Sequence, residues 1–157
     1  RVAPVDEHWE RTETFQWLSR VNRTFLRWQA PIVQHLALRR VYHVNKAWAG
    51  FKPPDGTGLV VQAGTDREAL PLVVSEFKHE NGADYVMIVN SSQRESAAGS
   101  VRVQGRQPKA FRVDWEASEQ SAATDEWHCQ QGADGVTVQA WLAPGQMELY
   151  RIEQAKP

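Results

Sequence analysis

The side chains that most often perform catalysis occur in this sequence, but their spacing matches no common catalytic pattern. The five histidines are dispersed along the chain, and G-x-S-x-G, H-E-x-x-H and glycine-rich phosphate-binding motifs are absent. His128 and Cys129 are neighbours in a predicted strand, so their side chains point to opposite faces and are not expected to share a metal ion. Cys129, the one cysteine, is interpreted as a small, partly buried residue and not as a nucleophile. We predict no catalytic residue, no metal site and no cofactor in this chain.

Carboxylates are the second chemistry to consider, because a glycosidase needs two of them roughly 5–10 Å apart across a cleft. The candidates are Glu76, Glu80, Asp84, Asp114 and Glu116. Nothing in their spacing marks two of them as a pair. Glu80 and Asp84 flank a predicted turn, where acidic residues are common for other reasons. We interpret these carboxylates as solvated residues of turns and strand edges.

Seven tryptophans offer a third chemistry, since a flat aromatic ring can stack on the apolar face of a sugar. Trp48, Trp115 and Trp127 lie near predicted loops or strand ends and are the candidate carbohydrate-binding residues. The alternative is that they form core or interdomain contacts. The strand face on which Trp141 lies stays open, because its alternation with the preceding valines is imperfect.

The first forty residues have the pattern of an amphipathic helix. Asp6 is a predicted N-cap, and Pro31 should kink or split the helix because it lacks an amide hydrogen, leaving residues 32–40 as a second short helix. Trp17 is predicted, like Trp28, to make core or interdomain contacts. Apolar residues three or four positions apart form one stripe: Leu18, Val21, Phe25, Trp28 and Ile32. Such a helix needs a partner surface.

After Val41 the pattern changes to short apolar runs separated by glycine- and proline-containing turns. Asn81-Gly82 predicts a hairpin, because both residues tolerate a positive φ. Residues 117–125 are predicted as a polar loop. The runs predicted as strands are 41–44, 59–62, 72–77, 85–90, 100–103, 110–113, 127–130, 136–141 and 147–152. We predict a mainly β fold, in which an antiparallel β-sandwich of about eight or nine strands (residues 41–157) follows a helical segment (residues 1–40).

The composition excludes several classes of function. Lys and Arg total 18 and Asp and Glu total 19, so the net charge is −1. A chain this close to neutral lacks the positive patch that binds a phosphate backbone, and we predict no nucleic-acid partner. No run approaches the roughly 18 apolar residues of a membrane helix, so no membrane partner is predicted. The sequence starts at Arg1 without a basic and apolar leader, which we interpret as a removed leader or as part of a longer polypeptide.

Three stretches, taken in order, carry a resemblance to a known architecture. Residues 25–36, followed by 41–43, look like a closing helix that leads into a first sandwich strand. Residues 72–77 and 81–91 are similar to a hairpin whose second strand ends in an Asn, and residues 142–152 to a final strand with a turn just before it. Together they resemble the C-terminal end of a glycoside hydrolase, where the last helix of a TIM-barrel catalytic domain is followed by a β-sandwich.

The resemblance implies a non-catalytic domain that braces the catalytic domain or contributes to subunit contacts. In such enzymes the catalytic carboxylates lie at the ends of barrel strands, which would precede Arg1. The implied partner is an upstream catalytic domain, or another subunit, contacted through the N-terminal helix. Two other hypotheses stay open: a carbohydrate-binding module that holds a polysaccharide through exposed tryptophans, and a small stand-alone glycosidase. An extracellular or periplasmic location would suit a polysaccharide-acting enzyme, and the single cysteine fits any compartment.

Overall fold

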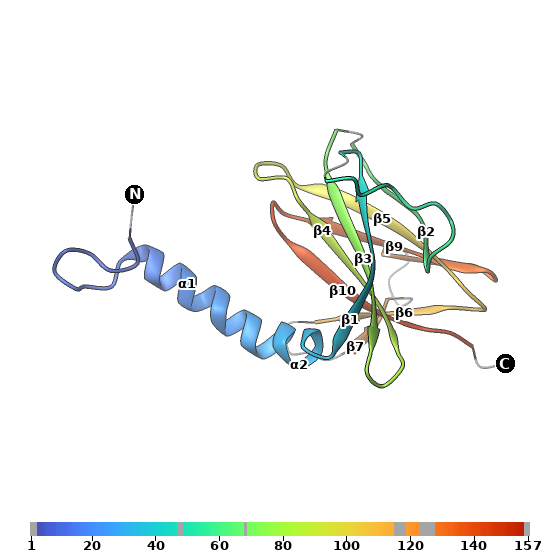
Figure 1. Ribbon diagram of the computed structural model, residues 1–157, viewed down its shortest axis with the longest axis horizontal. Coiled ribbons are helices and arrows are strands. Elements are labelled where there is room, and N and C mark those ends of the chain that lie inside the picture. The colour runs from blue at the N-terminus through green and yellow to red at the C-terminus, as the bar shows by residue number, and fades with distance from the viewer. Residues whose placement is uncertain (1–2, 47–48, 68, 115–118, 123–127, 156–157) are drawn as a thin grey trace. The chain divides into compact units, whose positions relative to one another are not determined.

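The computed structural model describes most of the 157-residue chain (Figure 1). The described residues are 3–46, 49–67, 69–114, 119–122 and 128–155.

Two compact units make up the chain. The helical unit comprises Arg1–His35 and Asp114–Ser118, and the β unit comprises Leu36–Val113 and Glu119–Pro157. The division therefore falls at the start of the first strand, a few residues before the predicted division between residues 40 and 41.

The helical unit contains α1 (Glu13–Thr24), the π-helical turn η1 (Phe25–Gln29) and α2 (Ala30–Val33). The predicted N-cap at Asp6 is wrong, since α1 begins only at Glu13. Oδ1 of Asp6 instead accepts hydrogen bonds from the backbone amides of His8 and Glu10, at 2.9 and 2.8 Å. A short acidic side chain readily closes a local turn in this way, which competes with capping a helix.

The predicted break near Pro31 is confirmed. Regular α-helix ends at Thr24, and the π-helical turn η1 occupies the residues directly before Ala30. Pro31 lacks an amide hydrogen and its ring crowds the carbonyl four residues earlier, so an undisturbed α-helix is disfavoured there. The predicted second helix over residues 32–40 is wrong, because α2 ends at Val33 and a strand begins at Leu36.

Ten strands form the β unit within the described residues. They are β1 (Leu36–Val44), β2 (Val60–Thr65), β3 (Leu72–His79), β4 (Asp84–Asn90), β5 (Ala97–Gln104), β6 (Lys109–Val113), β7 (Glu119–Ser121), β8 (Cys129–Gln131), β9 (Gly135–Leu142) and β10 (Met147–Glu153). Each predicted strand corresponds to one of these. Conversely, β7 has no predicted counterpart, because this short polar strand lies inside the segment predicted as a loop.

The strands form two antiparallel sheets, as Figure 1 shows. The large sheet has six strands in the order β1-β3-β4-β10-β6-β7, and the small sheet has four in the order β2-β5-β9-β8. Neighbouring strands pair antiparallel in both sheets. The prediction of a mainly β, antiparallel sandwich-like fold is confirmed.

The β3–β4 hairpin forms at Asn81-Gly82, as predicted. Gly82 has a φ of 88°, and its amide donates to the His79 carbonyl at 2.8 Å. The Asn81 side chain accepts a hydrogen bond from the Ala83 amide at 3.0 Å. Glycine is needed here because a side chain at this φ would be strained.

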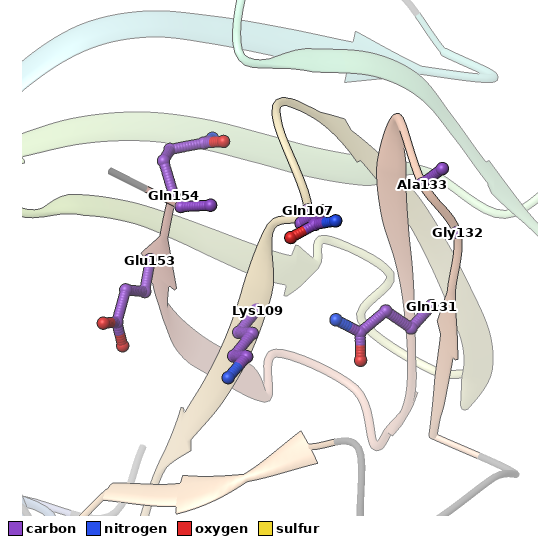
Figure 2. Close-up of a pocket in the computed structure, with 8 residues that line it drawn as sticks. Gln107, Lys109, Gln131, Gly132, Ala133, Glu153 and Gln154 are labelled. Carbon is purple, nitrogen blue, oxygen red and sulfur yellow. The ribbon is translucent and has the colours of Figure 1, made fainter. Parts of the chain in front are cut away.

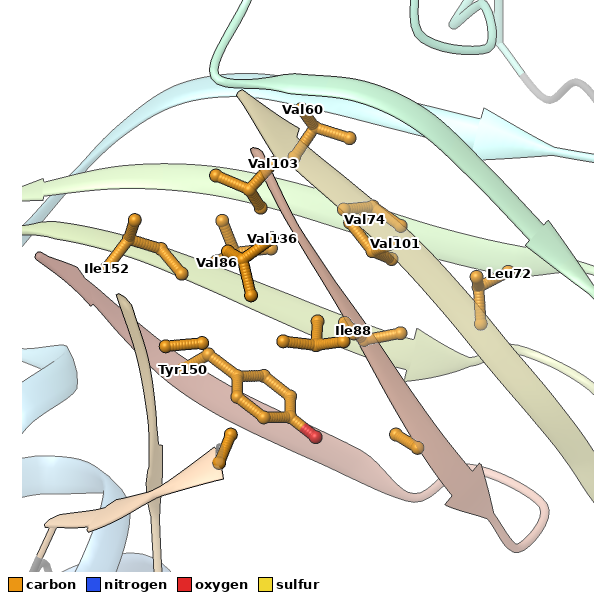
Figure 3. Packing of buried hydrophobic residues seen from close by; sticks show 14 of the residues in the cluster. Val60, Leu72, Val74, Val86, Ile88, Val101, Val103, Val136, Tyr150 and Ile152 are labelled. Carbon is orange, nitrogen blue, oxygen red and sulfur yellow. The ribbon is translucent and has the colours of Figure 1, made fainter. Parts of the chain in front are cut away.

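The core lies between the sheets and is made largely of valine and other aliphatic side chains (Figure 3). Val74, Val86 and Ile88 from the large sheet face Val101 and Val103 from the small sheet, and all are fully buried. The sheets approach closely at Gly99, where an added Cβ would lie 3.3 Å from Leu72 Cδ1 and 3.5 Å from Ile88 Cγ2. Inward side chains alternate with outward ones along each strand, so each sheet also has an outward face that does not contribute to this core.

Candidate functional site

The three tryptophans predicted to bind carbohydrate, Trp48, Trp115 and Trp127, lie outside the described residues. Trp141 is described, and the register resolves its face. It lies directly opposite Ala98 on the outward side of the small sheet and is 56% exposed. Trp17 in α1 is 58% exposed, so the chain itself does not bury it, and its predicted interdomain contact stays a prediction.

Glu76 departs most clearly from its prediction. The interpretation as a solvated residue is wrong, because Glu76 is only 5% exposed and points into the sandwich. Its Oε1 accepts a hydrogen bond from the Tyr42 hydroxyl at 2.8 Å and another from the Val60 amide at 2.7 Å. Since Val60 belongs to the small sheet and Glu76 to the large one, this carboxylate ties the two sheets together.

The other predicted carboxylates behave differently from Glu76. Asp84 is half-buried and forms an ion pair with Lys78 at 2.8 Å, Glu80 is exposed, and Asp114 is half-buried. Glu116 lies outside the described residues.

Glu148 is a second buried carboxylate, and no sequence motif pointed to it. Its Oε2 accepts a hydrogen bond from the Tyr150 hydroxyl at 2.6 Å, and its Oε1 accepts one from Arg112 Nη2 at 2.7 Å. The signal that could have found it is alternation, because Glu148, Tyr150 and Ile152 occupy the inward positions of one strand.

The two buried carboxylates are engaged in separate networks. β4 lies between their strands, and each keeps its own hydroxyl partner and its own N–H partner. Buried polar groups need such partners, and removing one partner of a buried charge is strongly destabilising. Within the described residues, then, the buried acids serve the fold and do not face each other across an open cleft.

The same networks shift the pKa values of the tyrosines. Burial and the hydrogen bond to Glu76 raise the pKa of Tyr42 to about 12. Burial and the neighbouring Glu148 raise the pKa of Tyr150, and burial and Glu119 raise that of Tyr85. These are the three tyrosines of the chain. Because the pKa of each is raised above the ordinary value of 10.0, each stays protonated in the folded protein at pH values where a free tyrosine ionises.

Alkaline pH is therefore expected to unfold the protein before it ionises the tyrosines of the folded state. A raised pKa contributes stability that is present below the unfolded value of 10.0 and is lost as the pH rises towards about 12. The tyrosinate absorption band should titrate near the ordinary value in denaturant, but in native buffer it should appear only together with loss of the folded circular-dichroism signal. Native-state ionisation near the ordinary value, with the fold intact, would contradict these environments.

Cys129 confirms its interpretation as a small, partly buried residue. It is 7% exposed, and burial raises the pKa of its thiol, which keeps it protonated and unreactive near neutral pH. Among the described residues, no three His, Cys, Asp or Glu side chains are grouped to hold a metal ion. No helix in the described part of the chain combines the length and the hydropathy needed to cross a bilayer.

The outward face of the large sheet is mostly apolar. Residues directly opposite one another in the register point to the same side, so Val41, Ser75, Met87 and Leu149 form one outward row. With the rows on either side they form what we call the apolar sheet face. Its apolar members are Val41, Val73, Phe77, Tyr85, Met87, Val89, Phe111, Met147 and Leu149, and the same rows also contain Leu38, His43, Ser75 and Arg151. Of the apolar members, Tyr85 and Leu149 are buried and the others are half-buried.

The outward face of the small sheet is polar by comparison. Its rows are set by the same register argument, and we call it the polar sheet face. Its members are Gln62, Ser100, Arg102, Gln130, Thr137, Gln139 and Trp141. A sandwich in water usually carries polar residues on both outward faces. The apolar sheet face is therefore the candidate functional surface of the β unit.

No protein-family model, curated protein or solved structure matches the chain.

Proposed function

We propose that this chain is a non-catalytic accessory domain of a glycoside hydrolase, and that it braces an upstream catalytic domain. The observation that carries the proposal is the contrast between the apolar and the polar sheet faces. The enzyme class comes from the resemblance of the segment order to the end of a TIM-barrel hydrolase. Glu76 and Glu148 both bond to groups of the chain itself, which supports a structural and not a catalytic role for the domain.

The energetics favour a covered apolar sheet face. Apolar surface costs roughly 25 cal/mol per Å² when it stays in water, so several hundred Å² would cost several kcal/mol. Monomeric proteins rarely leave a continuous apolar patch of that size open. A large rigid domain is a suitable cover for a broad, regular sheet face.

The helical unit supports the same role. Its stripe residues Leu18, Val21 and Phe25 are 47%, 61% and 45% exposed. α1 has 12 residues, and a helix of that length is marginal in water without a surface to pack on. Docking on the catalytic domain would bury this stripe, as expected for the last helix of a barrel.

The residues encoded before Arg1 provide the first test. The proposal expects alternating strands and helices there, with Glu or Asp at the C-terminal ends of strands. An unrelated domain at that position would contradict it.

A matched pair of charge substitutions tests the docking surface. Met87→Glu places a charge on the apolar sheet face, and Thr137→Glu places the same charge on the polar sheet face; both positions are half-buried. In the parent enzyme, Met87→Glu is expected to shorten the half-life of thermal inactivation at least about tenfold, because an unpaired charge is buried against the catalytic domain. Thr137→Glu should leave the half-life nearly unchanged.

The control is the unfolding of this chain by itself, which neither substitution should alter by more than about 1 kcal/mol. Equal half-lives for the two variants in the parent enzyme would contradict docking through the apolar sheet face.

The exposed Trp141 ring favours a second candidate function, a carbohydrate-binding module. Hydroxyl and amide side chains, Ser100 and Gln139, share its sheet face and could bond to a sugar stacked on the ring. Under this alternative, affinity electrophoresis in polysaccharide gels should show retardation that Trp141→Ala abolishes and that Trp9→Ala, at another exposed tryptophan, does not. No polysaccharide-dependent retardation is expected if the chain only braces the enzyme.

A further inference from the structure

One end of the sandwich carries a pocket (Figure 2). It is formed by the turn between β5 and β6, the hairpin between β8 and β9, and the end of β10. Its volume is about 490 Å³, within the range of small-molecule sites. The polar side chains that line it are Gln107, Lys109, Gln131, Glu153 and Gln154.

Backbone hydrogen bonds tie the three segments to one another. The Gln107 amide donates to the Ala133 carbonyl at 3.2 Å, and the Gly105 amide donates to the Asp134 carbonyl at 3.1 Å. The Ala155 amide donates to the Arg106 carbonyl at 3.0 Å. The pocket is therefore held open by the fold, and a ligand would not have to order its loops.

Two features of the lining are energetically costly. Oε1 of Gln154 is buried and has no hydrogen-bond partner within the described residues, although buried acceptors normally have one. Its amide packs where a Cβ on Gly105 would collide with it. Gln107 has a φ of 45°, a left-handed conformation that is unfavourable for a residue with a side chain and that clusters at functional sites.

The polar groups indicate the class of ligand. Lys109 and Glu153 lie directly opposite each other on β6 and β10, so their charges cancel over the pocket. Lys109 has no ion-pair partner in the described part of the chain, and Glu153 keeps only a 3.5 Å contact with Arg151. Ammonium, carboxylate and amide groups together offer both donors and acceptors, which a hydroxyl group needs because it donates and accepts.

We propose that this pocket binds a neutral polyhydroxylated ligand, a terminal sugar residue. Lys109 donates to one ligand hydroxyl, and the side-chain amides of Gln107 and Gln131 bond to others. The site shares no residue with the apolar sheet face, so either proposal can fail alone.

Protein-observed NMR of the 157-residue chain tests the site directly. The probes are glucose, galactose, mannose, xylose, cellobiose and maltose, with glucuronate and inorganic phosphate as charged comparisons. At least one neutral sugar is expected to shift the side-chain amide signals of Gln107, Gln131 and Gln154, while the two anions do not. No shift at these amides with any neutral sugar, at the highest soluble concentration, would overturn the proposal, as would binding of the anions alone.

Two variants localise the binding, and a third is the control. Gln107→Gly removes one amide and suits the left-handed backbone, so the turn should be kept, and Lys109→Ala removes an exposed donor. Each is expected to weaken sugar binding about three- to tenfold, as for one lost hydrogen bond. Gln62→Ala, an exposed amide on the polar sheet face, should have no effect. Equal weakening by all three variants, or shifts centred on Trp141, would overturn the assignment to this pocket.

Discussion

Glu76→Ala is expected to lower the free energy of unfolding by about 3 kcal/mol, the cost of leaving two buried donors without an acceptor. The Tyr42 hydroxyl and the Val60 amide both donate to Glu76 Oε1, at 2.8 and 2.7 Å, in the interior between the sheets. Water cannot easily replace the carboxylate there. Urea unfolding of the variant and the parent chain measures the difference.

A surface glutamate provides the matched control for this prediction. Glu95→Ala removes a carboxylate that pairs with Arg67 at 3.1 Å while both side chains are more than half exposed. Exposed pairs contribute little, so the loss should stay below about 1 kcal/mol. Tyr42→Phe, which removes one donor and leaves the other, should cost about 1 kcal/mol. If Glu76→Ala proved no worse than Glu95→Ala, Glu76 would not hold the sheets together.

Leu72→Ala is expected to destabilise the protein by about 3 kcal/mol, because it opens a cavity in a core that is otherwise closely packed. Leu72 is 1% exposed and faces Gly99 of the small sheet. The cost combines lost burial and the empty volume, since a β-sheet cannot collapse freely around a missing side chain. Calorimetric and urea unfolding should agree on the loss if the transition is two-state.

Gly99→Ala makes this prediction specific to one contact. In the parent chain the added methyl would lie 3.3 Å from Leu72 Cδ1, so the substitution should be neutral or destabilising. In the Leu72→Ala chain the same methyl enters the cavity, and it should recover about 1 kcal/mol. A double-mutant cycle without coupling between the two positions would show that the sheets do not meet at Gly99 as described.

Local patterns were sufficient for most strands and for the turns between them. Alternation and glycine chemistry, as at Asn81-Gly82, act within a few residues and leave their mark in the sequence. The sequence does not predict β7, because Glu119–Ser121 is short and polar and forms a strand through its pairing with β6. The pattern of residues 36–40 predicts a helix because Leu36 and Leu38 fit both the helical and the strand period, and pairing with β3 makes these residues a strand.

The site residues depended more strongly on distant contacts. The charge of Glu76 favours a solvated position. Its alternation with Leu72 and Val74 along β3 favours an inward position, and the structure has it inward. The pocket at the end of the sandwich could not be predicted, because its lining residues Gln107 and Gln154 are far apart in the sequence. The pairing of β6 with β10 brings these two residues together, and the small sheet adds the hairpin between β8 and β9.

The position of β10 has a consequence for how the protein is made. It is synthesised after the other nine described strands, yet it lies inside the large sheet, between β4 and β6. Until it leaves the ribosome, β4 and β6 each have an unpaired edge, and such edges invite aggregation. The chain should therefore fold late and in one step, with few stable partial structures. A premature stop just before Met147 would split the large sheet in two instead of trimming it, and the truncated product should be cleared by proteases.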